Sequence, residues 1–122
     1  MSQINGQCHC GAIKFTVNSS EGLQGLRKCN CSLCRRKNVV MATAKLPEFQ
    51  ITVGEDKLNL YQWNTKIAKH YFCSVCGIYT HHQRRAAPDE YGFNAACIER
   101  IKVADLEEVP TIDGAAMTLV GE

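Results

Sequence analysis

The chain has 122 residues, a formal charge of +2, and 45% hydrophobic but only 7% aromatic residues. This length suits one compact domain over residues 1–122, with a modest hydrophobic core. The near-neutral charge and the few aromatic residues argue against a nucleic-acid partner, and no apolar run is long enough to predict a membrane span. The feature of the composition that needs an explanation is its eight cysteines.

The role of these cysteines depends on the compartment in which the chain folds. The first ten residues, MSQINGQCHC, have neither the basic region nor the apolar run of a secretory signal, so we expect a cytoplasmic protein. Because a reducing cytoplasm disfavours structural disulfides, the cysteines are predicted to bind metal or to take part in catalysis.

Alternation of apolar and polar residues predicts mainly short β-strands. In Ala12–Asn18, the apolar residues Ile13, Phe15 and Val17 alternate with polar ones, which is the period of a strand with one buried face. We expect further strands at Asn38–Leu46, Phe49–Val53, Leu58–Trp63, Lys66–Phe72, Ile78–Gln83 and Tyr91–Ile98.

Little helix is expected between these strands. Leu33–Lys37 and Val103–Glu108 are each predicted to form a short helical turn, and Thr111–Glu122 fits either a last strand or a loosely packed tail. The pattern therefore predicts an all-β domain, with several short antiparallel strands in more than one sheet and the cysteines in the turns that join them.

The cysteines fall into three clusters with the short spacings of zinc ligands. Cys8 and Cys10 form the first cluster, and Cys73 and Cys76 form the third. Two such pairs together supply the four thiolates of a closed, tetrahedral zinc site. These four cysteines are predicted to hold one structural Zn²⁺ that ties the N-terminal strand to a later hairpin.

The middle cluster offers three thiolates, Cys29, Cys31 and Cys34, within one loop. Three protein ligands and one open position are typical of catalytic zinc, so we expect a second Zn²⁺ here. Two alternatives stay open. A nearby histidine or Cys97 closes the second site, or Cys31 and Cys34 join the third cluster in a zinc ribbon, which leaves the first cluster and Cys29 without a role.

The three clusters and their neighbours resemble the glutathione-dependent formaldehyde-activating enzyme family, also called the CENP-V/GFA domain family. The matching segments are GQCHCGAIKF at residues 6–15, CNCSLCRR at residues 29–36, and FCSVCGIYTHH at residues 72–82. One departure is Asn30, where many relatives carry His.

The resemblance implies a β-tent, in which several short antiparallel sheets lean together around zinc-binding turns. It also implies structural zinc at Cys8, Cys10, Cys73 and Cys76, and the active zinc at Cys29, Cys31 and Cys34. The family's namesake reaction joins glutathione and formaldehyde into S-hydroxymethylglutathione and is classed with the carbon–sulfur lyases.

The chemistry of a three-thiolate zinc site agrees with such a reaction. This electron-rich ion is a poor activator of water, but a substrate thiol in its open position would lose its proton and become a nucleophile for a small carbonyl carbon. We therefore expect a zinc-dependent carbon–sulfur lyase that acts on the adduct of a small thiol, such as glutathione, with formaldehyde or another small aldehyde.

Basic and imidazole side chains near the clusters are candidate substrate ligands. Arg35 and Arg36 follow the middle cluster and suit the carboxylates of glutathione, although a solvated basic turn has the same composition. His81 or its neighbour His82 is a candidate proton shuttle or fourth ligand.

Two other functional classes remain open from the sequence. Cys97 lies in an apolar segment that we expect to be a strand, where it is either a small buried side chain or the nucleophile of a thiol oxidoreductase on a zinc-stapled scaffold. The third class is a non-catalytic zinc-binding module, which would need a basic face with stacking aromatic residues.

Overall fold

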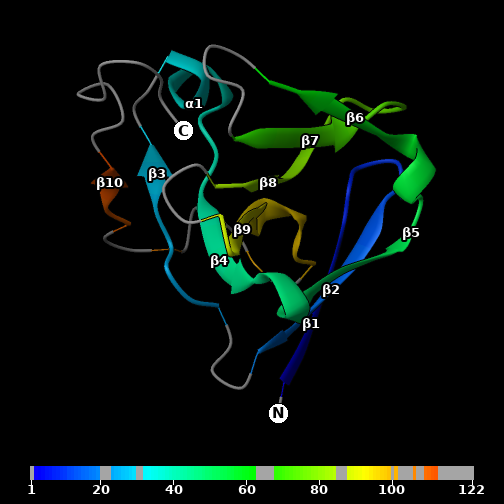
Figure 1. Ribbon diagram of the computed structural model, residues 1–122, viewed down its shortest axis with the longest axis horizontal. Helices are drawn as coiled ribbons and strands as arrows, with labels where there is room; N and C mark the ends of the chain where they lie inside the picture. Colours follow the sequence, from blue (N-terminus) through cyan, green and yellow to red (C-terminus); the bar gives the residue numbers. More distant parts are fainter. Residues whose placement is uncertain are drawn as a thin grey trace.

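The computed structural model describes residues 2–19, 23–29, 32–62, 68–84, 88–99, 101, 106 and 109–112. Within these residues the chain is mostly β, as the periodicity predicts, with three sheets and one short α-helix (Figure 1). Among the described residues, no helix has the length and apolarity that a membrane span requires.

The first sheet contains three antiparallel strands in the order β1-β2-β5. Their bounds are Ser2–Gln7 for β1, Lys14–Ser19 for β2 and Phe49–Val53 for β5. Phe15 and Val17 are buried on one face of β2, so the predicted alternation is confirmed. Strand β1 was not expected, because Ile4 is its only apolar residue apart from glycine.

The second sheet is larger, with five antiparallel strands in the order β4-β9-β8-β7-β6. In chain order these strands are β4 (Met41–Lys45), β6 (Leu58–Tyr61), β7 (Lys69–Cys73), β8 (Tyr79–Gln83) and β9 (Glu90–Asn94). All five were expected, and β4, β6 and β8 lie inside the expected ranges, whereas β7 runs one residue further, to Cys73, and β9 begins one residue earlier, at Glu90. Strand β4 ends where the 3-10 helix Leu46–Glu48 begins.

The third sheet is a parallel pair, β3 (Lys28–Cys29) with β10 (Thr111–Ile112). It lies on the left of Figure 1, on the side away from β1 and β2. The strand interpretation is therefore confirmed for Thr111–Ile112, and residues 113–122 lie outside the described part. Helix α1 (Ser32–Lys37) follows β3, one residue longer than the predicted helical turn. Most of the helix expected at Val103–Glu108 lies outside the described residues.

The strand expected at Tyr91–Ile98 ends early, and this part of the prediction is wrong. After β9, Ala95–Cys97 form a 3-10 helix. The side chain of Asn94 accepts a hydrogen bond from the backbone N–H of Ala96 at 3.0 Å, which caps this helix in place of strand pairing. Cys97 consequently lies on a helical turn and not on a strand.

The hydrophobic core joins the two larger sheets. Phe15 of β2 stacks on Phe49 of β5 with ring centroids 5.0 Å apart, and its edge contacts Phe93 of β9 at 6.0 Å. Ala42 and Ala44 of β4 are buried in the same cluster. Gly6 of β1 faces Phe15 across the sheet, and a Cβ built on it would lie 2.4 Å from the phenyl ring, so this strand position needs glycine.

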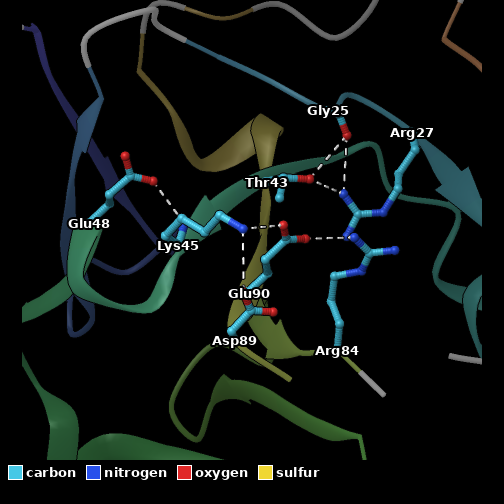
Figure 2. A network of polar contacts seen from close by, with 8 residues as sticks. All are labelled: Gly25, Arg27, Thr43, Lys45, Glu48, Arg84, Asp89 and Glu90. Atoms are coloured by element: carbon cyan, nitrogen blue, oxygen red, sulfur yellow. Dashed lines mark hydrogen bonds and ion pairs between the residues drawn. The ribbon is translucent and has the colours of Figure 1, made fainter. Parts of the chain in front are cut away.

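An ion-pair network joins the ends of β4, β8 and β9 (Figure 2). Glu90 accepts hydrogen bonds from Arg84 at 2.9 Å and from Lys45 at 3.0 Å, and Lys45 also contacts Asp89 at 3.4 Å. The hydrogen bond from Lys45 is the main reason that the pKa of Glu90 is lowered, and Arg84 contributes to the same shift. The network therefore ties Arg84 and Asp89, which flank the β8–β9 connection, to the end of β4.

We expect Glu90→Gln to lower the free energy of unfolding by roughly 1 kcal/mol at pH 7. Because the folded-state pKa of Glu90 is lowered, its stabilisation is complete above the unfolded pKa of about 4.3 and is lost as pH falls through the folded value. The difference from wild type, measured by urea unfolding, should thus shrink as the solution is acidified below the unfolded pKa of about 4.3. Glu99→Gln, at an exposed carboxylate, is the control, and a Glu90 effect that persists in acid would contradict the assignment.

Candidate functional site

Four cysteines from two distant turns meet at one point. Cys8 and Cys10 lie in the turn between β1 and β2, Cys73 ends β7, and Cys76 lies in the turn that leads to β8. Their Sγ atoms all lie within 4.8 Å of one another. The structure thus brings together the first and third clusters, as grouped from the sequence.

The sulfur separations fit a tetrahedral zinc ion. The Sγ of Cys10 lies 3.7 Å from those of Cys8 and Cys73. Zn–S bonds of about 2.3 Å give a tetrahedron with sulfur–sulfur edges of about 3.8 Å, whereas a disulfide bond is about 2.05 Å long. None of the seven described cysteines forms a disulfide. We conclude that this is a four-cysteine cluster that fits Zn²⁺.

The backbone of both turns supports thiolates. Gly11 and Gly77 each have φ of 80°, the left-handed conformation that glycine adopts without strain. The backbone N–H of Ile13 points to the Sγ of Cys8 at 3.4 Å, and the N–H of Val75 points to the Sγ of Cys73 at 3.3 Å. Such donors favour the charged form of sulfur, so the turns are arranged for metal ligands.

The pKa values of two cysteines in this cluster are shifted in opposite directions. Burial raises the pKa of the Cys76 thiol, but backbone N–H groups of Cys10 and Ile78 and hydrogen bonds with neighbouring thiols lower it to about 6. At Cys10 the N–H of Ala12 lowers the pKa, yet burial and the surrounding thiols raise it to about 11. Opposite shifts are expected where like charges crowd together, and a divalent cation would allow all four sulfurs to ionise.

Cys29 and Cys34 of the middle cluster lie at a separate place, between β3 and helix α1. Cys29 ends β3 and is half-buried, and Cys34 is buried on α1. Cys31 lies outside the described residues. Both described cysteines line two cavities, which we call the inner and the outer cavity. The structure therefore shows a pair from the predicted second site.

The two cavities differ in size and in their other walls. The inner cavity has a volume of about 20 Å³ and is lined, besides the cysteines, by Arg27, Val39, Met41, His82 and Arg84. The outer cavity, of about 180 Å³, is lined by Lys28, Arg35, Asn38, Val39 and Thr111. Cationic groups therefore surround the two thiols on both sides.

The candidate substrate residues are placed differently from one another. Arg35 lines the outer cavity, and Arg36 is exposed on α1. His81 lies elsewhere, in the wall of a cavity of about 560 Å³ with Phe49 and Tyr71, and its ring stacks on Tyr71 at 4.6 Å. Burial lowers the pKa of His81 to about 3, so its ring is neutral at pH 7. The structure does not bring His81 to Cys29 and Cys34.

The inner cavity contains Arg27, which was not singled out from the sequence, together with Arg84 and the candidate His82. Arg27, two positions before Cys29, is buried, and its guanidinium donates to the carbonyl oxygen of Gly25 at 3.1 Å and to the hydroxyl of Thr43 (Figure 2). Arg84 follows β8, and His82 lies on that strand, adjacent to the expected His81. The closeness of Arg27 to Cys29 in the sequence could have suggested this arginine. Which of the two adjacent histidines faces the cavity is shown only by the strand register.

Gly92 on β9 makes room for this arrangement. A Cβ built on Gly92 would lie 2.7 Å from both Nη2 of Arg27 and Cε1 of His82. Because His82 pairs with Gly92 across the sheet, a larger residue would displace one of these two side chains.

Comparison with known proteins now places the fold. Residues 3–111 match the family model described as glutathione-dependent formaldehyde-activating enzyme (GFA). The chain belongs to the GFA family. The four-cysteine cluster and the Cys29–Cys34 pair are thus features of a GFA-family domain, as the resemblance of the three motifs predicts.

Two relatives illustrate the extent of this similarity. A crystal structure of a Rhodobacter sphaeroides protein superposes with a TM-score of 0.85 at 48% identity, and the match covers 89% of this chain and 100% of that one. A Halomonas elongata protein, whose name provisionally assigns it as a glutathione-dependent formaldehyde-activating enzyme, is 27% identical over 81 residues. That match covers 60% of this GFA-family chain and 51% of the relative, so the chain spans about half the length of that curated relative.

Cys97 is placed as a core residue of this GFA-family fold. Its side chain is 7% exposed and packs in the core cluster, and its thiol points to the carbonyl oxygen of Tyr79 at 3.8 Å. Burial, with the charge of Cys8 and Cys76, raises the pKa of Cys97 to about 12. A thiol of this kind is a poor nucleophile, which argues against the oxidoreductase alternative.

Removal of one sulfur tests the four-cysteine cluster. We expect Cys73→Ser to bind one zinc ion fewer per chain than wild type, as measured by elemental analysis, and to unfold at a much lower temperature. The stabilisation at risk is large, because structural zinc contributes about 10–16 kcal/mol in small domains.

A matched control uses Cys97, a buried cysteine outside the three clusters. Cys97→Ala should keep the full zinc content and cost only about 1–2 kcal/mol of stability. If Cys73→Ser does not fold, the exposed Cys10→Ser measures the same loss of zinc. Wild-type zinc content in both ligand variants would contradict the assignment.

Proposed function

We propose that the chain is a zinc-dependent carbon–sulfur lyase that acts on the adduct of a small thiol, such as glutathione, with formaldehyde or another small aldehyde. The observation that supports this most directly is the pair Cys29 and Cys34, which line a cavity together with two arginines and a histidine. The family supplies the class of reaction, since its name describes glutathione-dependent activation of formaldehyde.

Each group of cysteines would bind its own zinc ion, one with a structural role and one with a catalytic role. The four-cysteine cluster would hold one zinc ion, and Cys29, Cys31 and Cys34 would hold a second one with a coordination position left for substrate. Zinc bound by three thiolates stabilises the thiolate form of a coordinated substrate thiol.

The two cavities match the two parts of the substrate. A water molecule needs about 10–15 Å³ of free volume, so the inner cavity of about 20 Å³ has room for a molecule as small as formaldehyde. The outer cavity is nine times larger by the volumes of 180 and 20 Å³, and Lys28 and Arg35 line it. These cations suit the two carboxylates of glutathione, which would lie outside while its thiol reaches Cys29 and Cys34.

The charges of the inner cavity favour the bond-forming step. When the substrate sulfur attacks the carbonyl carbon, a carbon–sulfur bond forms, the π electrons move to oxygen, and this oxygen takes a proton. Arg27 and Arg84 present guanidinium groups to the cavity where this negative oxygen develops. The lyase direction reverses each step. Because Glu90 binds Arg84 at 2.9 Å, the charge of that arginine is partly balanced.

Two further residues and the compartment of the protein were also predicted from the sequence. Arg36 would bind substrate from the exposed surface of α1, whereas His81, which lies in a separate aromatic cavity, has no part in the proposed step. We further propose that residues 1–122 act as one domain in the cytoplasm, where glutathione is abundant and reduced.

Loss of a middle-cluster thiol should separate catalysis from folding. We expect Cys29→Ser to retain the four-cysteine cluster, to bind one zinc ion per chain where wild type binds two, and to lose catalysis at least about 100-fold. The measurement is magnetisation exchange between ¹³C-formaldehyde and its glutathione adduct at equilibrium. Cys97→Ala should retain both metal and exchange rate, and full activity in Cys29→Ser would refute the proposal.

Arg35 allows the orientation of the thiol to be tested. Arg35→Gln removes a cation from the outer cavity, so we expect the KM for glutathione to rise about tenfold, which corresponds to about 1.4 kcal/mol. The KM for 2-mercaptoethanol, which has no carboxylate, should stay within about twofold. Equal effects on the two thiols would mean that Arg35 does not bind carboxylate.

A further inference from the structure

A buried chain of hydrogen bonds connects two histidines through one tyrosine. Nδ1 of His70 lies 3.1 Å from the hydroxyl oxygen of Tyr79, and this oxygen lies 2.6 Å from Nδ1 of His82. His70 on β7 pairs directly with His82 on β8, and the two rings are 1% and 4% exposed. The sheet register therefore sets all three groups in a fixed row.

Two proton arrangements carry hydrogen bonds along the whole row when both imidazoles are neutral. The hydroxyl of Tyr79 has one proton, so it donates to one imidazole and accepts from the other. In one arrangement His82 carries its proton on Nδ1, which leaves its Nε2 free to accept a proton, and His70 carries its proton on Nε2. In the other arrangement both assignments are exchanged. Passing from the first to the second takes in a proton at Nε2 of His82 and releases one at Nε2 of His70.

The two ends of the row belong to different cavities. His82 lines the inner cavity with Cys29 and Cys34. His70 lines another cavity, of about 320 Å³, together with Lys37 and Tyr61. Nε2 of His70 is buried and has no hydrogen-bond partner among the described residues. A buried nitrogen without a hydrogen-bond partner is unfavourable, and a proton pathway through the row gives this atom a role as its outer end.

The surroundings prevent either imidazole from keeping an extra proton. Burial lowers the pKa of His82 well below its usual range, and Lys37, His70, Arg27 and Arg84 lower it further. Burial and Lys37 lower the pKa of His70 to about 4. A base at this position works at neutral pH only if the proton that it accepts leaves again.

We propose that His82, Tyr79 and His70 form a proton relay between the inner cavity and the cavity beside Lys37. In this relay, the substrate thiol gives its proton to Nε2 of His82, His82 gives its Nδ1 proton to Tyr79, Tyr79 passes its own to Nδ1 of His70, and His70 releases its Nε2 proton to water. The reverse sequence returns a proton to the alkoxide oxygen of the adduct. This inference rests on the proposed function, with His82 as the catalytic group and Tyr79 and His70 as positioning residues.

The relay makes a specific spectroscopic prediction for the zinc-loaded protein. ¹⁵N spectra of labelled histidine should show one of the two residues protonated on Nδ1 and the other on Nε2. Addition of glutathione should shift both tautomer populations together. Tyr79→Phe, which removes only the hydroxyl, should leave His82 responsive to glutathione and His70 unresponsive. Identical tautomers in wild type, or a His70 signal that ignores glutathione, would overturn the relay.

Kinetics supply an independent readout. In the formaldehyde exchange assay we expect Tyr79→Phe to lower the rate constant at saturating substrate about 100-fold with little change in KM. The rate of wild type in H₂O–D₂O mixtures should curve with deuterium content, since several protons move, and that of Tyr79→Phe should be linear. Tyr71→Phe, which removes a hydroxyl from β7 outside the row, should behave as wild type.

The results distinguish the relay from the function on which it rests. A Tyr79→Phe enzyme with the wild-type rate and the same isotope curve would overturn the relay and leave the lyase assignment intact. Wild-type protein that fails to accelerate the exchange, but whose two histidines respond together to glutathione, would overturn the lyase assignment and support the relay.

Discussion

The meeting of four sulfur atoms between two turns is the constraint on which the rest of the structure depends. Cys10 and Cys73 are separated by 63 residues along the chain, yet their Sγ atoms lie 3.7 Å apart. Cys8, Ile13 and Cys73 are buried together in a small cluster apart from the main core, with Ile51 and Leu58 packed against it. A cation shared by the four sulfurs would add to this small hydrophobic contact and fix the β1–β2 turn against the β7–β8 turn.

This fixed point also sets the position of β8. The strand leaves the turn of Cys76 at once, so Tyr79 and His82 are held three and six residues from the cluster. Antiparallel pairing with β7 and β9 then places His70 and Gly92 beside His82. A structural feature at one end of the sheet thus determines the geometry of the cavity beside Cys29 and Cys34, although it contributes no atom to that cavity.

Some of this arrangement could be predicted from the sequence, and some could not. Short spacing in the pairs Cys8–Cys10 and Cys73–Cys76 indicates ligands of one ion, and the alternation around Phe15 indicates a half-buried strand, because both depend on local geometry. The choice between His81 and His82 could not be made, since adjacent residues of a strand face opposite sides and periodicity alone gives no absolute facing. Asn94 likewise ends β9 through a side-chain contact that propensity does not encode.

The parallel pairing of β10 with β3 gives the outer cavity a wall from a distant part of the chain. Thr111 pairs with Lys28, and both line that cavity beside Cys29. Cys29, which supplies sulfur, and Thr111, which borders the entrance, therefore belong to separate stretches of sequence. If the outer cavity binds the substrate thiol as proposed, exchange of Thr111 would reshape that cavity for bulkier or differently charged thiols while Cys29 and Cys34 stay unchanged. Differences in substrate preference between such domains would then arise at the strand of Thr111.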